Sequence, residues 1–132
     1  MLKAVLVKEV AVRIADRVGE LSKVLAPIAE LRLNIDAINT VSISGAAQVS
    51  LIVEDTVKVV DALKRAGFTP WEQDVVAVEI ANEAGAVAEV AAKLAQSEID
   101  IRASWASTGS GVNTTLYLWT ADNALAVKKL TV

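Results

Sequence analysis

The sequence predicts an α+β fold made of two copies of one small unit. Shifting the 132-residue chain against itself by about 66 positions places residues 10–16 on residues 76–82 and sets Gly19 on Gly85. Within each copy, stretches with strand periodicity and stretches with helical periodicity follow one another in the same order. A repeat this long indicates two modules and not a solenoid, which needs about three or more shorter repeats to bury a continuous core.

The composition places the chain among compact proteins with a large apolar core. Apolar residues make up 54% of the sequence, and the mean hydropathy is +0.46. Each copy alone would be marginally stable because small domains bury little surface, so we expect the two copies to pack side by side. No apolar run reaches the roughly 18 residues that span a membrane, and Lys3 and Lys8 interrupt the N-terminal segment. We therefore expect a cytoplasmic protein without a membrane partner.

Missing residue types exclude most catalytic and nucleic-acid-binding classes. The chain has no cysteine and no histidine, which removes thiolate nucleophiles, the usual zinc ligands and the commonest general base. The net charge is −3 and no basic cluster stands out, so nucleic acid is not an expected partner. Acidic residues such as Glu9, Glu54 and Glu72 are scattered over different elements. We expect no enzyme activity, no metal site and no cofactor.

The first copy opens with a strand, a glycine turn and a helix. Apolar residues alternate with other residues over 10–15, as in a half-buried strand, and Gly19 follows. The segment 21–31 then has apolar residues at helical spacing. In the segment 34–43 the alternation returns, with Ile35 and later odd-numbered residues on one face.

The first copy continues with a hairpin, a second helix and a last strand. Gly45 marks the hairpin turn into a strand over 48–53, and Asp55 is placed to cap a helix that ends at Gly67. Residues 68–74 lead out as a further strand. The order strand, helix, strand, strand, helix, strand is the split βαβ plan of ferredoxin-like folds.

The second copy repeats this order but ends before its fourth strand. Strands are expected over 76–80, 99–107 and 112–120, followed by a helix from Asp122, and the sequence ends at Val132. A strand-like segment, Leu2 to Val7, precedes the first copy, and we expect it to supply the strand that the second copy lacks. The expected domains are residues 1–74 and 75–132, with residues 1–7 pairing with the second domain.

The turn and second strand of each copy resemble those of ACT domains. That family's turn usually reads Asp-x-Pro-Gly-x-Leu, and the first copy keeps Asp16, Gly19 and Leu21 but has Val18 in place of the proline. The second copy has a weaker match in Asn82 and Gly85. The resemblance covers nearly the whole chain and is to small free-standing bacterial proteins made of two ACT units.

The resemblance implies a regulatory protein that senses a small molecule. Members of the family bind an effector, most often an amino acid, between two ACT units and pass the signal to a metabolic enzyme. When two units lie side by side as in that family, the turn of one faces the start of the second strand of the other. The implied ligand-binding residues are Asp16, Arg17, Gly19, Glu20, Asp100 and Ile101 for the first site, and Asn34, Ile35, Asn82, Gly85 and Ala86 for the second.

The first of these two sites is the better match to a free amino acid. Arg17 can grip a carboxylate through two hydrogen bonds, and Asp100 can accept from an ammonium group. The second site has Glu83 and Asn34 at the equivalent positions. The alternative is that the glycines serve only the turns and that Arg17 is a solvated surface charge.

The aromatic residues suggest where subunits meet. Alternation places Trp105 on the core face with Ile101, whereas Trp119 and Tyr117 lie on the face that the helices leave uncovered. Trp71, after Pro70, is expected to pack at a strand edge. An exposed aromatic pair favours a homo-oligomer, most simply a dimer. A rival interpretation is therefore an interaction module that docks onto a metabolic enzyme without a ligand of its own.

Overall fold

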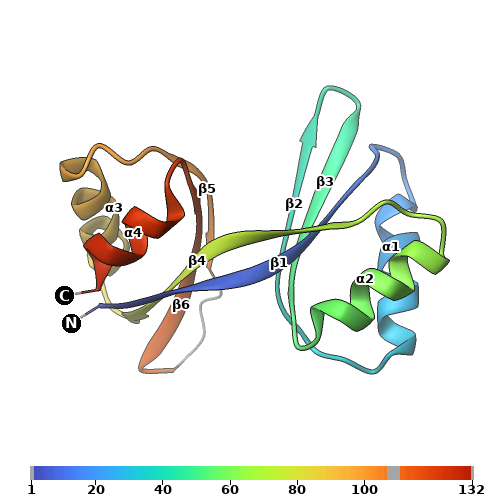
Figure 1. Cartoon of the computed structure of the whole chain (residues 1–132), viewed down its shortest axis with the longest axis horizontal. Helices are drawn as coiled ribbons and strands as arrows, with labels where there is room; N and C mark the ends of the chain where they lie inside the picture. The colour runs from blue at the N-terminus through green and yellow to red at the C-terminus, as the bar shows by residue number, and fades with distance from the viewer. Residues whose placement is uncertain (1, 107–110, 132) are drawn as a thin grey trace. The chain divides into compact units, whose positions relative to one another are not determined.

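Figure 1 shows the computed structural model of the chain, which describes residues 2–106 and 111–131. The predicted α+β class is confirmed, and each copy has the predicted order of strands and helices. The described elements of the first copy are β1 (Lys3–Ala15), α1 (Glu20–Glu30), β2 (Ile35–Ile43), β3 (Ala46–Val53), α2 (Thr56–Arg65) and β4 (Trp71–Ala81). Those that follow are α3 (Ala86–Gln96), β5 (Ile101–Ala106), β6 (Asn113–Thr120) and α4 (Asn123–Leu130). Ser107, at the end of one predicted strand, lies outside the described residues.

The long strands β1 and β4 each join two segments that the sequence analysis treated as separate strands. Residues 3–7 and 10–15 belong to the single strand β1, and residues 71–74 and 76–80 belong to the single strand β4. Leu2 and residues 68–70 of the predicted strands lie outside β1 and β4. No glycine or proline interrupts either strand, so nothing ends the extended backbone between the segments. The chain divides into a first unit, Lys8–Gln73, and a second unit, which holds the residues up to Val7 and those from Asp74 onward.

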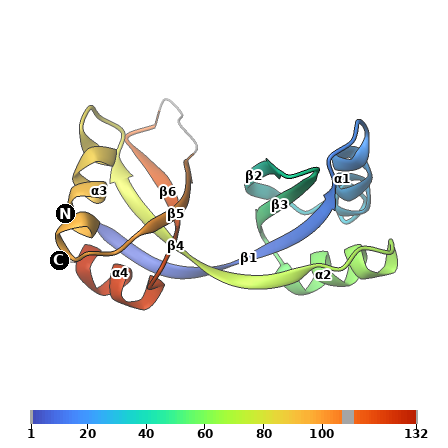
Figure 2. The same ribbon diagram turned by 90° about the horizontal axis from the view of Figure 1, so that it is seen from above.

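In the first unit, β3 lies between β2 and β1, and β1 is followed by the start of β4. Strands β1 and β3 are antiparallel, with Val10 opposite Leu51 and Ala15 opposite Ala46. Figure 2 shows α1 and α2 on one side of these strands. The core forms between the two layers, and its fully buried members include Val12, Val24 and Leu63.

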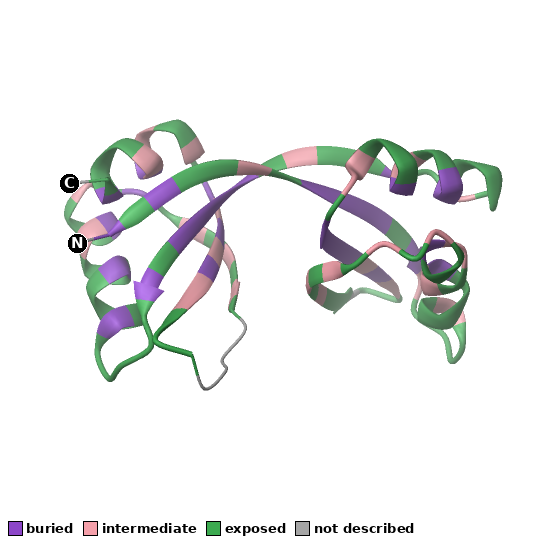
Figure 3. Cartoon of the chain, turned by 90° about the horizontal axis from the view of Figure 1, so that it is seen from below, coloured by how far each residue is buried: buried purple, intermediate pink, exposed green. Residues whose placement is uncertain are grey.

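In the second unit, the N-terminal part of β1 lies beside β4, followed by β6 and β5. Leu2 and Ala4 are buried in the same core as Val78, and the Thr131 hydroxyl donates to the Ala4 carbonyl at 3.3 Å. The prediction that the N-terminal segment supplies the missing strand is therefore confirmed. Figure 3 shows the buried residues on the strands and at intervals along the helices.

A β-bulge near the start of the second strand of each copy changes which residues face the core. Ile101 pairs with Thr120, but the next pair is Ala103 with Trp119, so one extra residue separates the two pairs. The same shift occurs between Ile35 and Ala37. Ile35 and Ile101 pack against the cores, whereas Ala37 and Ala103, the first paired residues after the bulges, lie on the face without helices.

The bulge makes the prediction for Trp105 wrong. Trp105 pairs with Tyr117, and their rings stack with centroids 6.0 Å apart and planes 20° apart. The neighbours of Tyr117 in β6, Leu116 and Leu118, are buried in the core, so Trp105 and Tyr117 lie on the opposite, helix-free face. Trp119 shares that face, as the sequence predicted, and the Arg102 guanidinium lies 5.7 Å from its ring centre.

Candidate functional site

The turn between β1 and α1 has an open helix N-terminus. The Asp16 backbone N–H donates to the Gly45 carbonyl at 3.1 Å, which fixes where the turn begins. Gly19 is the N-cap residue of α1, with a φ of 89°, and no side chain caps the helix. A side chain at Gly19 would meet no atom within 4 Å, so the left-handed backbone explains the glycine and the space beside it is open.

The turn between β4 and α3 has the same backbone. Gly85 is the N-cap residue with a φ of 87°, and no side chain of the described residues caps α3. Asn82 donates from its backbone N–H to the Val112 carbonyl at 2.9 Å and from Nδ2 to the Gly111 carbonyl at 3.0 Å. Ala86, the first residue of α3, is buried. The first helical N–H group of each helix donates to a carbonyl in its turn, Glu20 to Arg17 at 3.2 Å and Ala86 to Glu83 at 3.4 Å. Both predicted turns still present the partial positive charge of a helix N-terminus, which suits an anion.

Charges around the two turns differ. Arg17 Nη2 and Lys23 Nζ both lie 3.2 Å from Glu20 Oε1, so the carboxylate of Glu20 is held between two cations. The Arg17 side chain is 72% exposed, and such exposed pairs contribute about 1 kcal/mol or less. A ligand carboxylate that binds Arg17 would have to replace Glu20 as its partner, and breaking this exposed ion pair costs little free energy.

The starts of the second strands carry the other predicted residues. Asn34 Nδ2 donates to Asp36 Oδ1 at 2.7 Å, and Ile35 packs against the core of the first unit. The Asp100 carbonyl accepts from the Ala121 N–H at 2.9 Å, and Ile101 packs against the core of the second unit. The Asp100 residue is exposed, and its carboxylate has no partner among the described residues.

Within one unit, the turn and the start of the second strand do not meet. Ala15, just before the first turn, pairs with Ala46 at the beginning of β3, whereas Ile35 pairs with Val53 at its end. The two groups therefore lie at opposite ends of the same strand. A site that uses both groups requires two units, and the pairing expected between the copies stays a prediction.

The carboxyl group of Glu9 is buried, which the sequence patterns did not predict. Glu9 is 1% exposed; it accepts a hydrogen bond from Gln73 Nε2, and its Oε2 has no partner among the described residues. Burial raises the pKa of Glu9, although hydrogen bonds with Gln73 and Ser50 act in the opposite direction. The sequence offered one signal, because the second copy has Val75 at the equivalent position.

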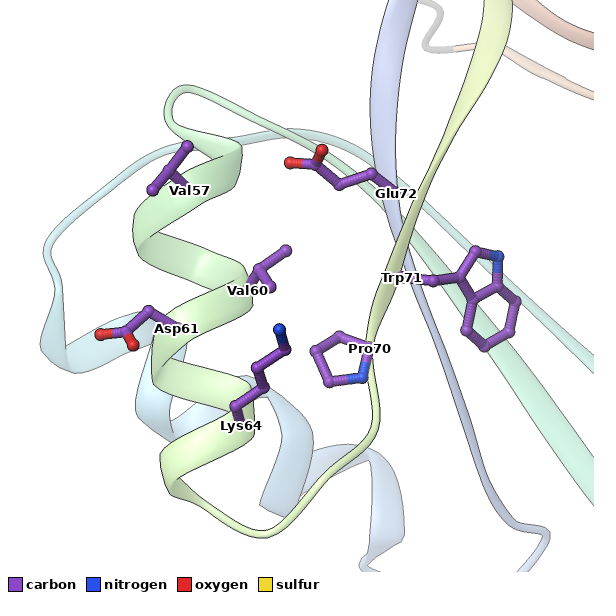
Figure 4. Close-up of a pocket in the computed structure, with 7 residues that line it drawn as sticks. All are labelled: Val57, Val60, Asp61, Lys64, Pro70, Trp71 and Glu72. Carbon is purple, nitrogen blue, oxygen red and sulfur yellow. The ribbon is translucent and has the colours of Figure 1, made fainter.

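A groove of about 420 Å³ lies between α2 and the start of β4 (Figure 4). Val57 and Val60 line it from the helix, and Pro70 lines it from the opposite side. Asp61, Lys64 and Glu72 add charges, and the ring of Trp71 points away from α2 in Figure 4. Trp71 Nε1 donates to Gln73 at 3.0 Å.

Neither metal chemistry nor membrane insertion is indicated by the described part of the chain. No group of three or more aspartate or glutamate residues that could hold a metal ion occurs in it. Its helices are also too short or too polar to cross a membrane.

Comparison with known proteins identifies the fold. No protein-family model and no curated protein matches the chain. A crystal structure of a Bacteroides thetaiotaomicron protein matches with a TM-score of 0.88 and 21% identity, covering 96% of this chain and 88% of that one. The ligand-free regulatory subunit of aspartate kinase from Thermus thermophilus matches with a TM-score of 0.69 and 17% identity, over 96% and 93% of the two chains.

The regulatory subunit of aspartate kinase from Thermus flavus gives a similar result, with a TM-score of 0.66 and 16% identity over 97% and 94% of the chains. These matches extend over nearly the full length of both proteins. The chain therefore has the ACT-like fold found in regulatory subunits of aspartate kinase, as the turn motifs predicted.

Proposed function

We propose that this chain is a regulatory protein of amino acid metabolism that binds a free amino acid and has no catalytic activity of its own. The observation that carries the proposal is the fold, which matches an aspartate kinase regulatory subunit over 96% of this chain. The two open helix N-termini at Gly19 and Gly85 support it, because each can receive the carboxylate of an amino acid.

The proposed first site combines the Gly19 turn with the strand start at Asp100. The ligand carboxylate accepts from the backbone N–H groups at Gly19 and Glu20 and from the Arg17 guanidinium. The Glu20 N–H then leaves the Arg17 carbonyl, and the guanidinium leaves the Glu20 carboxylate. The ligand ammonium group donates to the Asp100 carboxylate, beside Ile101. The family resemblance is what pairs these two groups of residues.

The proposed second site is the weaker one. It combines the turn residues Asn82, Gly85 and Ala86 with Asn34 and Ile35. Glu83 takes the place of Arg17 and would repel a carboxylate, and Asn34 is already bonded to Asp36 at 2.7 Å. We therefore expect one occupied site per chain at low ligand concentration.

A thermal-shift screen against the twenty amino acids, followed by calorimetry, tests the proposal. Arg17→Glu should weaken binding of the selected amino acid about tenfold or more, because a hydrogen bond to a charged group contributes roughly 1.5–3 kcal/mol. Arg32→Glu makes the same charge change at an exposed arginine beyond the other end of α1 and should leave binding unchanged. Equal affinities of wild type and Arg17→Glu would remove Arg17 from the site.

A second candidate function is docking onto a metabolic enzyme, with the chain as a homodimeric interaction module. It is favoured by the half-buried aromatic residues Trp105, Tyr117 and Trp119 on the helix-free face of the second unit. Sedimentation of the chain, alone and mixed with the aspartate kinase of its own organism, tests this function. Complex formation without any amino acid response in the thermal-shift screen would favour docking over sensing.

A further inference from the structure

A pocket of about 330 Å³ opens on the helix-free face of the first unit, where β2 turns into β3. It is lined by Arg13, Ser44, Ala46, Ala47 and Gln48, and we call it the Arg13 pocket. Arg13 and Gln48 are opposite each other in adjacent strands. The neighbouring pair, Val12 and Val49, is fully buried against the helices, so Arg13 and Gln48 point to the other face.

The polar side chains of the Arg13 pocket have no partners among the described residues. No hydrogen bond or ion pair involves the guanidinium of Arg13, the hydroxyl of Ser44 or the side-chain amide of Gln48 there. By contrast, Arg17 is paired with Glu20 at 3.2 Å, and Arg65 with Asp61 at 3.1 Å. Three unpartnered side chains that can donate hydrogen bonds therefore meet in one small pocket.

The hairpin turn fixes one of these donors. Ser44 and Gly45 both have positive φ values, 51° and 80°, as in the two-residue turns that join antiparallel strands. Glycine, asparagine and aspartate are the usual residues in such a conformation, and serine is uncommon there. The tight turn places Ser44 at the edge of the pocket.

In the second copy, the position equivalent to Arg13 does not carry a positive charge. Glu79 takes the place of Arg13, and Asn113 takes the place of Ala46, because Ala15 pairs with Ala46 and Ala81 pairs with Asn113. Asn113 Nδ2 donates to Glu79 Oε1 at 3.1 Å, so the carboxylate of Glu79 has a partner within its own unit. The position of Arg13 therefore carries a cation without a partner among the described residues in the first copy and a hydrogen-bonded carboxylate in the second copy.

We propose that the Arg13 pocket binds the carboxylate group of a small organic acid. A guanidinium presents two parallel N–H groups that match the two oxygens of a carboxylate. A single cation in a chain of net charge −3 suits a singly charged ligand better than a phosphate. The volume lies near the lower end of the roughly 300–1,000 Å³ typical of small-molecule pockets, and Ala46, on the same face as Gln48, offers apolar contact.

The ligand of the Arg13 pocket differs from the amino acid proposed for the Gly19 turn. No aspartate or glutamate lines the pocket, so an ammonium group would find no opposite charge there. A carboxylic acid without an amino group fits these residues better than a zwitterion. The inference therefore stands whether or not an amino acid binds at Gly19.

Amide chemical-shift titration of the full chain with propionate, alanine and inorganic phosphate tests this assignment. Propionate should shift the amides of residues 44–48, and Arg13→Gln should weaken its binding about tenfold or more. Arg13→Lys keeps the positive charge but lacks the two parallel N–H groups of the guanidinium. Its affinity for propionate should lie between those of the wild type and Arg13→Gln. The matched control, Arg32→Gln, removes an exposed arginine elsewhere in the same unit and should bind propionate as the wild type does.

The amide spectra also report whether each variant is folded, so loss of binding is separable from loss of structure. Equal propionate affinities of wild type and Arg13→Gln, or no shifts at residues 44–48, would overturn the proposal. Tighter binding of phosphate than of propionate would overturn the carboxylate assignment. Alanine binding that depends on Arg17 and not on Arg13 would support the amino acid site separately.

Discussion

Replacing Glu9 with glutamine should stabilise the protein at neutral pH. Glu9 is 1% exposed, and its Oε2 has no partner among the described residues, so a charged carboxylate is poorly solvated there. Glutamine has nearly the same shape, carries no charge and retains an oxygen that can accept from Gln73. The glutamine Nε2 group that replaces Oε2 also lacks a partner among the described residues, so the gain comes from removing the buried negative charge. We expect a gain of about 1–2 kcal/mol near pH 7, because each unit by which burial raises the pKa of Glu9 corresponds to about 1.4 kcal/mol.

The gain from Glu9→Gln should depend on pH in a definite direction. Burial raises the folded-state pKa of Glu9 above its ordinary value of 4.5. A raised pKa means that the folded protein holds this proton more tightly than the unfolded chain does. The resulting stability is fully present below pH 4.5 and is lost as the pH rises through the folded-state pKa. The two proteins should therefore be nearly equal in stability at pH 4 and differ most near neutral pH.

Urea unfolding of wild type and Glu9→Gln at several pH values between about 4 and 8 measures this difference. Glu72→Gln is the matched control, because it removes an exposed carboxylate from the same part of the first unit and should show no such pH-dependent gain. A Glu9→Gln protein that is less stable than wild type at pH 7 would refute the reasoning. A difference that does not change with pH would refute it equally.

Two further predictions concern the backbone. Gly85→Ala should lower the free energy of unfolding by about 1–2 kcal/mol, because the φ of 87° is unfavourable for alanine even without crowding. In the same urea assay, Gly111→Ala should lower the free energy of unfolding by a smaller amount, because its new Cβ meets only an ordinary contact at 3.5 Å. Removal of residues 2–7 should destabilise the second unit, and amide exchange at residues 76–80 should become faster. Unchanged protection of those amides in the truncated protein would contradict that expectation.

The order of elements could be predicted because it depends on local patterns. Asp55 and Asp122 precede apolar residues at helical spacing, and their side chains accept from Lys58 N at 3.1 Å and Leu125 N at 3.0 Å. Gly19 lies where strand periodicity gives way to helical periodicity, and its φ of 89° agrees with that position. The internal repeat also predicted the role of the N-terminal strand. The second copy lacks its fourth strand, and the first copy is preceded by one additional strand-like segment, so the additional segment is expected to replace the missing strand.

Alternation failed at the bulges, because one extra residue reverses the face of every residue that follows. Alternation counted from Ile101 predicts that Trp105 faces the core, whereas the bulge between Ile101 and Ala103 places it on the helix-free face. A bulge depends on how a strand pairs with its neighbour. The alternating residues of one strand do not encode it.

The sequence by itself determined the α+β class, the two copies, the caps and the glycine turns, since each depends on residues that are close together in the chain. Only the tertiary structure decided which polar groups have partners. Glu9 meets Gln73 across two strands, and Arg13 meets no carboxylate among the described residues, although both are charged residues of β1. Desolvation and pairing depend on groups that are distant in sequence, and folding alone brings those groups together.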